Sequence, residues 1–391
     1  MEVIINQLRL TDMQLNPQFN EFLKSVRPTE VQKEDWKNGA RTLRDRLNAD
    51  NDLKDIVVAT FLQGSIRRST AIRPSGEKRP DVDIVVVTSL DYNDLSPEEA
   101  MDRFRPFLEQ HYKGKWRPQG RSFGITLSYV DLDLVITALP MDEASRRTMK
   151  ALYQSQSVLT VNSLEEESTW RLNSNWRPMT LLSNAQLLED APQEEWKPHP
   201  LLLPDREAGK WGRTHPLAQI QWTAEKNRVC NGHYINLVRA IKWWRQEHVD
   251  DLPNYPKGYP LEHMIGQLLN DRTPTMAEGV VQVLESFKNT WWLNYTLEQV
   301  PVLYDHGVPE HNVLSRLSVD DFKAFYKQIS DAATLARSAL DNDDPTESGK
   351  LWQQLFGKKF PLPGARGGDR SNSGFTPPTQ PAQPGKTGRF A

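Results

Sequence analysis

The sequence DVDIVVVT, from Asp81 to Thr88, restricts the fold of this chain more than any other feature. Its β-branched residues predict a strand, and residues two apart in a strand project from the same face. The carboxylates of Asp81 and Asp83 therefore point the same way, while Val82, Ile84 and Val86 point into a core. Two adjacent carboxylates repel each other, and this arrangement suits a divalent cation better than solvent. A strand that simply begins with two exposed acids is the alternative interpretation.

A Gly-Ser pair lies upstream, at the end of another predicted strand. The segment DIVVATFL, from Asp55 to Leu62, predicts a strand that ends at Gln63, followed by Gly64 and Ser65. A Gly-Ser turn at a strand end presents backbone N–H groups and a hydroxyl, which bind phosphate oxygens. Such pairs are also common turn residues, so the pair alone is weak evidence for a phosphate site.

A third acidic segment follows further along the chain. Val130 to Leu139 alternates between polar and apolar residues, which predicts a strand with Asp131 and Asp133 on one face. A carboxylate from this strand, next to Asp81 and Asp83, would complete an oxygen-ligand site for two ions. Such ions activate an attacking hydroxyl and neutralise the leaving group of a triphosphate, and an aspartate is suited to accept the hydroxyl proton. The residues alone leave both Asp131 and Asp133 as candidates for the third carboxylate.

The order of these elements resembles the DNA polymerase beta-like nucleotidyltransferases. The signature consists of a strand, a Gly-Ser pair, an Asp-x-Asp strand and a later acidic strand. The resemblance implies an α+β fold in which a mixed sheet with helices carries the site. Beyond about residue 145 the sequence favours helices, so we expect a C-terminal helical domain and a bilobed molecule. The clearest predicted helices cover residues 29–48, 96–112, 224–248, 259–269, 275–291 and 318–340.

Three segments are predicted. Residues 1–165 form the nucleotidyltransferase core with an N-terminal spine helix, and residues 166–362 form a helical domain that closes the nucleotide cleft. Residues 363–391 are rich in Gly, Pro, Ser, Thr and Gln and almost without apolar side chains. Such a segment buries too little surface to offset its ordering entropy, so we expect a flexible tail.

Beyond the core, the chain resembles bacterial relatives of cyclic GMP-AMP synthase, the cGAS/DncV-like nucleotidyltransferases, which are also called CD-NTases or SMODS nucleotidyltransferases. The resemblance covers roughly residues 30–362, and the tryptophan-phenylalanine-glycine element is its most specific part. The elements that carry it are GSIRRSTAI from Gly64, WGRTHP from Trp211, LVRAIKWWR from Leu237, YPLEHMI from Tyr259, PEHNVLSRLS from Pro309 and WQQLFGKKFP from Trp352.

Members of this family join ribonucleoside triphosphates into cyclic di- or trinucleotides, often as second messengers of antiphage (CBASS) defence. The resemblance implies a cyclic oligonucleotide synthase that uses ATP and other ribonucleoside triphosphates, with a downstream effector that binds the cyclic product. It also implies two Mg2+ ions, with Mn2+ as the alternative metal. By position, Asp81, Asp83 and Asp133 are the metal-binding and catalytic carboxylates, and Gly64 and Ser65 hold the donor triphosphate.

The helical half adds one candidate for nucleotide binding. Lys242 lies in the helix that offers a lysine to the triphosphate in this family, and a charge on a long stem suits phosphate. A solvated lysine on an amphipathic helix is the alternative. For Trp211, Trp243 and Trp244, packing in a core is favoured over stacking on a base. Gly258 departs from the family, where a serine often precedes the aromatic residue, which puts a nucleotide contact from that serine in doubt.

The tail carries a separate hypothesis from the family. Some members occur with an E1/E2-like transferase, which links their C-terminal carboxylate to a target amine, and with a deconjugating peptidase. An extended segment with a small final residue meets the needs of that reaction. We therefore hypothesise conjugation at Ala391, with a flexible end of no function as the alternative.

Composition limits the class of protein. The net charge of −3 provides no overall positive charge for gripping long nucleic acid, so no duplex partner is expected. No apolar run is long enough to cross a bilayer, and the N-terminal residues lack the pattern of a secretory signal, so no membrane partner is expected. The one cysteine, Cys230, excludes an internal disulfide and fits a reducing compartment. We expect a cytoplasmic protein.

Two other functions compete with cyclic oligonucleotide synthesis. The same fold supports synthesis of linear oligoadenylate and transfer of nucleotides to RNA or protein. A non-catalytic nucleotide-binding protein is a more distant alternative, and the intact acidic set argues against it because clustered carboxylates repel phosphate without a metal. The residues do not determine the bases, the ring size or the linkage of a product.

Overall fold

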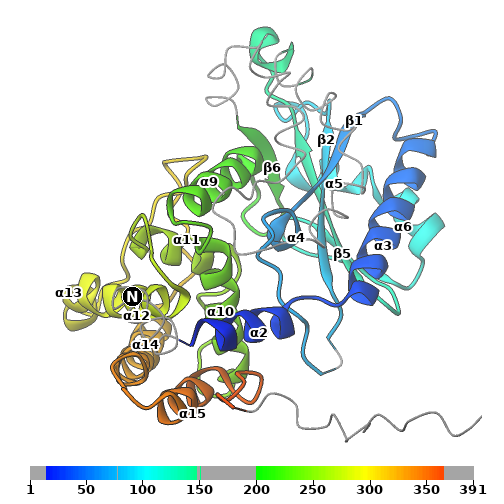
Figure 1. The fold of residues 1–391 in the computed structure, drawn as a ribbon. Helices are drawn as coiled ribbons and strands as arrows, with labels where there is room; N and C mark the ends of the chain where they lie inside the picture. Colours follow the sequence, from blue (N-terminus) through cyan, green and yellow to red (C-terminus); the bar gives the residue numbers. More distant parts are fainter. Residues whose placement is uncertain (1–14, 77, 148–149, 151–199, 365–391) are drawn as a thin grey trace, which may run out of the picture.

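The structure is a computed structural model that describes residues 15–76, 78–147, 150 and 200–364. In these ranges the chain forms two lobes, one built on a sheet and one built of helices (Figure 1). The predicted α+β fold with a mixed sheet and a C-terminal helical part is confirmed. The predicted boundary between residues 165 and 166, and the tail from residue 365 to Ala391, lie outside the described residues, so the predicted domain division stays a prediction.

Within the described part of the chain, seven strands form one mixed sheet. Five of them follow the order β1-β2-β5-β4-β3, and β6 joins the end of β5 and pairs with β7. β2 and β5 are parallel, whereas the other pairs of neighbours are antiparallel. The strands are β1 (Val57–Gln63), β2 (Asp81–Thr88), β3 (Trp116–Pro118), β4 (Phe123–Thr126), β5 (Asp131–Ala138), β6 (Leu201–Asp205) and β7 (Lys210–Thr214).

Helices cover one face of this sheet because alternate residues of the central strands are apolar. Val82 and Ile84 of β2 and Leu132 of β5 belong to one buried cluster with residues of the covering helices. α3 (Glu30–Ala49) begins at a capping box, in which Thr29 and Gln32 satisfy each other's backbone N–H groups. The other helices of this lobe are α4 (Gly64–Arg67), α5 (Pro97–Asp102) and α6 (Arg105–Tyr112).

The helical lobe is arranged around α10 (Tyr234–Glu247), which packs against α2, α9, α11, α12 and α15. Its apolar residues Ile235, Leu237 and Val238 are fully buried. In the described ranges, no helix combines the length and the apolarity that a bilayer crossing requires. The remaining helices of this lobe are α2 (Asn16–Val26), α9 (Pro216–Val229), α11 (Tyr259–Leu268), α12 (Met276–Thr290), α13 (Trp292–Thr296), α14 (Val319–Leu340) and α15 (Pro345–Phe356).

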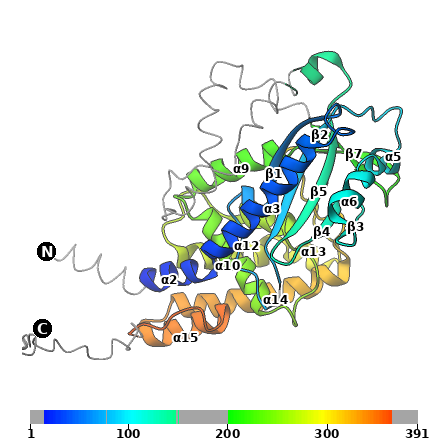
Figure 2. The ribbon, with the colours of Figure 1, turned by 90° about the vertical axis from the view of Figure 1, so that its right-hand side faces the viewer.

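The two ends of the described chain meet in an aromatic cluster. α2 and α15 lie side by side although they are far apart in the sequence (Figure 2). The rings of Phe19 and Trp352 are 5.0 Å apart at their centroids, and those of Phe22 and Phe356 are 4.7 Å apart. Phe360 completes the cluster, and all five side chains are buried. The specific Trp-Phe-Gly element of the sequence is therefore part of a core that also holds the N-terminal helix.

Several predicted elements differ from the observed ones. The predicted helix over 224–248 is two helices, because Asn231 and Gly232 adopt positive φ values of 55° and 79° that a helix excludes. The predicted helix over 96–112 is likewise divided, at residues 103–104. Expecting only helices after about residue 145 was wrong for β6 and β7, a hairpin that turns at Gly209 with a φ of 60°. The structure adds α2, which was not predicted.

We expect Phe356→Ala to destabilise the protein by about 3–5 kcal/mol, because the substitution leaves a cavity between α2 and α15. Trp292→Ala is the matched control, since the Trp292 side chain is 60% exposed and its loss should change stability by less than about 0.5 kcal/mol. Urea unfolding followed by tryptophan fluorescence measures both. Equal stability of the two variants would contradict this account of the aromatic cluster.

Candidate active site

The parallel pairing of β2 and β5 brings the predicted acidic residues together. In its register Asp81 lies beside Asp131, and Asp83 lies beside Asp133. The intervening Val82 is fully buried on the opposite face, as the alternation in the sequence predicts. Four carboxylates therefore share one face of the sheet at the start of both strands.

Asp131 and Asp133 differ in their surroundings. Asp131 lies 3.5 Å from the Nη1 atom of Arg79, at the exposed end of the strand. Asp133 accepts a hydrogen bond of 3.2 Å from the amide of Gln119 and lies directly beside Asp83 in the register. The position of Asp133 supports its choice as the third carboxylate, and the cation next to Asp131 gives that residue a different partner.

Burial and the mutual repulsion of the carboxylates on this face of the sheet raise the pKa values of Asp81 and Asp133. Loss of hydration and the nearby charges of Asp83 and Asp133 raise the pKa of Asp81 to about 7. Loss of hydration and the charge of Asp83 raise the pKa of Asp133 to about 6. Burial also raises the pKa of Asp83, against the opposing effect of Arg68 and Lys242. Bringing a cation to these carboxylates would remove the repulsion.

The side chains of Asp81, Asp83 and Asp133 are of a type that binds divalent metal ions, although their oxygens do not converge on one point. Among the described residues, no group of three His, Cys, Asp or Glu side chains is already drawn together around a point where an ion would fit. The three aspartates are nevertheless neighbours in the register, and their raised pKa values reflect a concentration of negative charge. Carboxylate oxygens are the ligands that Mg2+ prefers. The residues therefore fit such ions, with side-chain rotation needed for them to converge.

Gly64 meets this acidic face at close range. Gln63 pairs with Asp83 across β1 and β2, and Gly64 follows with a φ of 72°. A Cβ atom added at Gly64 would lie 1.7 Å from the Oδ2 atom of Asp83, so no larger residue fits here without displacing that carboxylate. Ser65 follows, and its carbonyl accepts hydrogen bonds from the backbone of Thr70 and Ala71. The Gly-Ser pair and the Asp-x-Asp strand thus adjoin, as predicted.

Lys242 is not the solvated lysine of the alternative interpretation. Its side chain is 13% exposed, and its Nζ atom lies 2.6 Å from the Oε1 atom of Glu262. The other oxygen of Glu262 lies 2.9 Å from the Nε atom of Arg68. Sequence reasoning missed Arg68 and Glu262 as members of the site, although both lie in family-like segments. The two residues are 194 positions apart in the sequence, and no local sequence pattern predicts that they pair.

Two cavities open beside these residues. One has a volume of about 420 Å3 and is lined by Ser65, Asp81 and Lys242. The second has a volume of about 690 Å3 and lies between β7, the start of α11 and the segment from Asp305 to Arg316. Both include Lys257 and Gly258, so they adjoin. Volumes of this size are typical of sites for small molecules.

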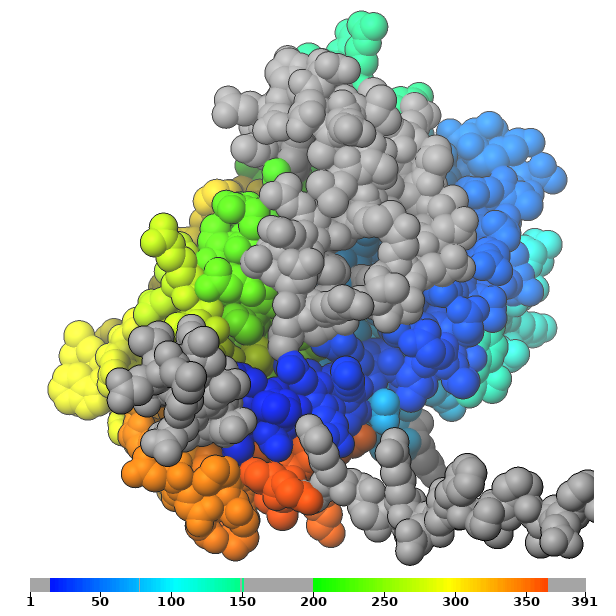
Figure 3. Space-filling model, viewed as in Figure 1, coloured from blue at the N-terminus to red at the C-terminus, as the bar shows by residue number. Residues whose placement is uncertain are grey.

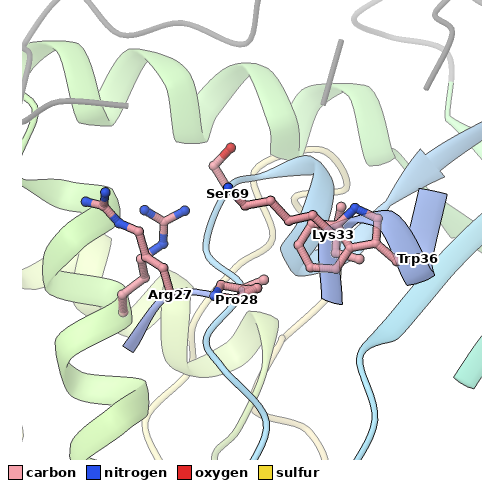
Figure 4. Close-up of a pocket in the computed structure, with 8 residues that line it drawn as sticks. Arg27, Pro28, Lys33, Trp36 and Ser69 are labelled. Carbon is pink, nitrogen blue, oxygen red and sulfur yellow. The ribbon is translucent and has the colours of Figure 1, made fainter. Parts of the chain in front are cut away.

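A third cavity is too small for a nucleotide. It lies between the α2–α3 connection and Ser69, where Arg27, Lys33 and Trp36 border it (Figure 4). Its volume of about 20 Å3 holds no more than one water molecule. On the surface, α2 and α3 form one blue band that crosses from the helical lobe to the sheet lobe near this position (Figure 3).

The tryptophans follow the expectation of core packing. Trp243 and Trp244 are 3% exposed, and the indole N–H of Trp243 donates to the carbonyl of Phe356. Trp211 is half-buried, and its indole N–H donates to the carbonyl of Leu95. None of these three rings lines either of the two larger cavities. Tyr259, which follows Gly258, does line the second cavity.

Comparison with known proteins agrees with the fold and shows the family. Residues 13–143 match the family model of the Second Messenger Oligonucleotide or Dinucleotide Synthetase (SMODS) domain. The chain is 65% identical to a probable cyclic AMP-AMP-GMP nucleotide synthase of Salmonella paratyphi B. The match covers 97% of this chain and the full length of that protein. The chain is 64% identical, with the same coverage, to the cyclic AMP-AMP-GMP synthase of Enterobacter hormaechei subsp. hoffmannii.

A solved structure shares the fold at low sequence identity. The structure of CdnC with ATP from E. coli MS115-1 superposes with a TM-score of 0.57 and 17% identity, covering 88% of this chain and 98% of that one. At that identity the likeness shows the fold alone. The full-length identity to the two synthases shows the family, and the resemblance inferred from the sequence is confirmed: the chain belongs to the CD-NTases, the bacterial cGAS/DncV-like nucleotidyltransferases.

Proposed function

We propose that this protein joins two molecules of ATP and one of GTP into cyclic AMP-AMP-GMP. Membership of the CD-NTases makes it a nucleotidyltransferase that synthesises cyclic oligonucleotides for antiphage signalling of the CBASS type. The particular trinucleotide is supported by identity of 64–65% over 97% of the chain with two relatives that carry this name. In the structure, the proposal depends on one observation, the carboxylate face of β2 and β5 beside the Gly-Ser turn.

Each predicted site residue has a role in this proposal. The backbone of Gly64 and Ser65 and the ammonium of Lys242 bind the donor triphosphate, which is consistent with the position of Ser65 and Lys242 in the lining of one cavity. Asp81, Asp83 and Asp133 hold two Mg2+ ions, with Mn2+ as the alternative. When bound, such ions would activate the acceptor hydroxyl for attack on the α-phosphorus and neutralise the pyrophosphate that leaves. Asp133 accepts the proton of that hydroxyl.

The two adjoining cavities support a site for two nucleotides at once. The donor lies in the cavity that contains Ser65, Asp81 and Lys242. The acceptor lies in the larger cavity, where Arg213 and Tyr259 are available to contact a base. Holding both partners converts an encounter in solution into a reaction between oriented groups. If the product is released only after ring closure, the linear intermediate stays bound and must change its position within this same space.

The product can be identified directly. We expect purified protein with the four ribonucleoside triphosphates and Mg2+ to form a species that resists phosphatase and has the mass of cyclic AMP-AMP-GMP. The reason is that a ring has no terminal phosphate. Mass spectrometry after phosphatase treatment makes the measurement. Linear products that phosphatase trims would favour the alternative of oligoadenylate synthesis or transfer to another acceptor.

Single substitutions distinguish the roles of the four carboxylates. We expect Asp81→Asn, Asp83→Asn and Asp133→Asn each to lower the rate of product formation by about a hundredfold or more, because each removes charge from the reacting centre. Asp131→Asn is the matched control on the same strand face, since its carboxylate is next to Arg79, and it should retain most of the activity. Thermal unfolding without metal checks that each variant is folded.

An inactive Asp131→Asn with an active Asp133→Asn would reverse the choice of the third carboxylate. Activity in Asp81→Asn and Asp83→Asn would remove the basis for the metal assignment.

Metal binding should release protons near neutral pH. The pKa values of Asp81 and Asp133, about 7 and about 6, mean that both groups are partly protonated in the metal-free protein below pH 7. Since metal binds the ionised form, we expect the affinity for Mg2+ to rise from about pH 5 to pH 8. Because these raised pKa values make the folded chain hold protons that the unfolded chain has lost, metal-free stability should fall as pH rises from about 4 to 7.

Isothermal titration in two buffers of different ionisation enthalpy measures the released protons. Release at pH 6 that disappears at about pH 8 is the expected result. Binding without proton release at pH 6 would contradict the raised pKa values.

A further inference from the structure

A buried group of three charges lies where the two lobes meet. Arg68 follows α4 in the sheet lobe, Lys242 belongs to α10 and Glu262 belongs to α11 of the helical lobe. The two oxygens of Glu262 are divided between the cations, at 2.9 Å from Arg68 Nε and 2.6 Å from Lys242 Nζ. Glu262 is only 1% exposed. A carboxylate so deeply buried costs free energy unless its partners compensate for lost hydration.

The surroundings hold Glu262 firmly in place. The hydroxyl of Tyr234 donates to its backbone carbonyl at 2.9 Å, within the same lobe. The guanidinium of Arg68 lies 5.1 Å above the ring of Tyr259, one turn earlier on α11. Burial disfavours ionisation of Glu262, but the charges of Arg68 and Lys242 outweigh that effect and lower its pKa to about 2. Glu262 is therefore an ionised, immobile anchor for two cations.

Lys242 depends on that anchor for its charge and its position. Burial lowers the pKa of Lys242, and the neighbouring cations Arg68 and Arg239 lower it further, whereas Glu262 raises it. The charge of Lys242 in turn opposes the rise in the pKa of Asp83, which belongs to the proposed metal site. Without Glu262, a buried ammonium would face two guanidinium groups, and it would turn away or lose its proton.

The anchored ammonium is fixed relative to the phosphate-binding turn. Its Nζ atom also donates to the carbonyl of Thr70 at 3.1 Å, and the backbone N–H of Thr70 donates to Ser65 at 2.8 Å. Lys242, Ser65 and Asp81 line one cavity. A chain of hydrogen bonds thus runs from Glu262 through Lys242 and Thr70 to the Gly-Ser turn, across the junction of the lobes.

We propose that Glu262 is a positioning residue for the donor triphosphate, which acts by holding the Lys242 ammonium beside the Gly-Ser turn. The inference rests on the proposed function of Lys242 as a phosphate ligand. Glu262 does not touch the triphosphate, because both of its oxygens are already bound to cations. Its effect on the reaction passes through Lys242, and it differs from that of a salt bridge that merely fastens the two lobes.

Binding of separate parts of the nucleotide tests the proposal. In Glu262→Gln we expect the Kd for inorganic tripolyphosphate, and the KM for ATP at saturating GTP, to rise by about tenfold or more, while binding of adenosine stays unchanged. Glu285→Gln is the matched control, since it removes an exposed ion pair with Arg337 in the same lobe and should alter none of these values. Lower affinity for adenosine as well as tripolyphosphate would indicate general loosening of the lobes and overturn the proposal.

A double-substitution cycle identifies the route of the effect. If Glu262 acts through Lys242, then Glu262→Gln added to Lys242→Met should cause no further rise in the Kd for tripolyphosphate. Independent, multiplying effects of the two substitutions would overturn the proposal. Glu262→Asp is the second variant if Glu262→Gln does not fold, because it keeps the charge and withdraws it by one methylene group. It should raise the Kd for tripolyphosphate above that of the wild-type protein, and an unchanged Kd would overturn the proposal.

The experiment separates this inference from the proposed function. Tripolyphosphate binding requires no turnover, so it reports on Glu262 even if the wild-type protein makes a different product. If Lys242→Met leaves tripolyphosphate binding unchanged, the role of Lys242 fails and the inference fails with it. If Lys242→Met weakens binding and Glu262→Gln does not, the inference alone fails.

Discussion

The pairing of β2 and β5 is the constraint on which the rest of the structure depends. Because the two strands are parallel and in register, each acid of one strand lies beside an acid of the other. The arrangement is unfavourable by itself, and it is held because the opposite faces of both strands are packed into a well-formed apolar core. Burial of Val82, Ile84 and Leu132 compels the aspartates to remain together. Hydrophobic burial on one side of the sheet thus maintains electrostatic repulsion on the other.

The second lobe supplies what the sheet lacks. The sheet lobe contributes negative charge, a glycine turn and the cation Arg68, whereas Lys242 comes from α10 and Glu262, which holds both cations, from α11. The candidate site therefore combines residues of both lobes, and the buried charges of Arg68, Lys242 and Glu262 are part of the contact between them. Catalysis in such a site follows from positioning and charge compensation. An isolated sheet lobe would lack Lys242 and Glu262, and an isolated helical lobe would lack the carboxylates and the Gly-Ser turn.

The sequence predicted the parts of the site whose pattern is local. Alternation placed Asp81 and Asp83 on one face, and the Gly-Ser pair after β1 was correctly located, because both depend on residues close in sequence. The neighbours that distinguish Asp131 from Asp133, Arg79 for the first and Asp83 and Gln119 for the second, come from the register and from side-chain contacts that the sequence does not show. The pairing of Arg68 with Glu262 depends on the tertiary fold alone, and so does the packing of α2. The break between α9 and α10 had a local signal, the Asn231-Gly232 pair, which outweighs the apolar periodicity around it.

The aromatic cluster between α2 and α15 has a consequence for how the chain is made. The first described helix is synthesised before the rest of the described chain, whereas Trp352, Phe356 and Phe360 are among the last described residues. The apolar face of α2 therefore lacks its aromatic partners on α15 until more than three hundred further residues have been added. The sheet lobe contains all of its described strands well before that moment. Completion of the helical lobe therefore requires the synthesis of α15, and a chain that lacks α15 leaves exposed the apolar face of α2 that the complete lobe buries.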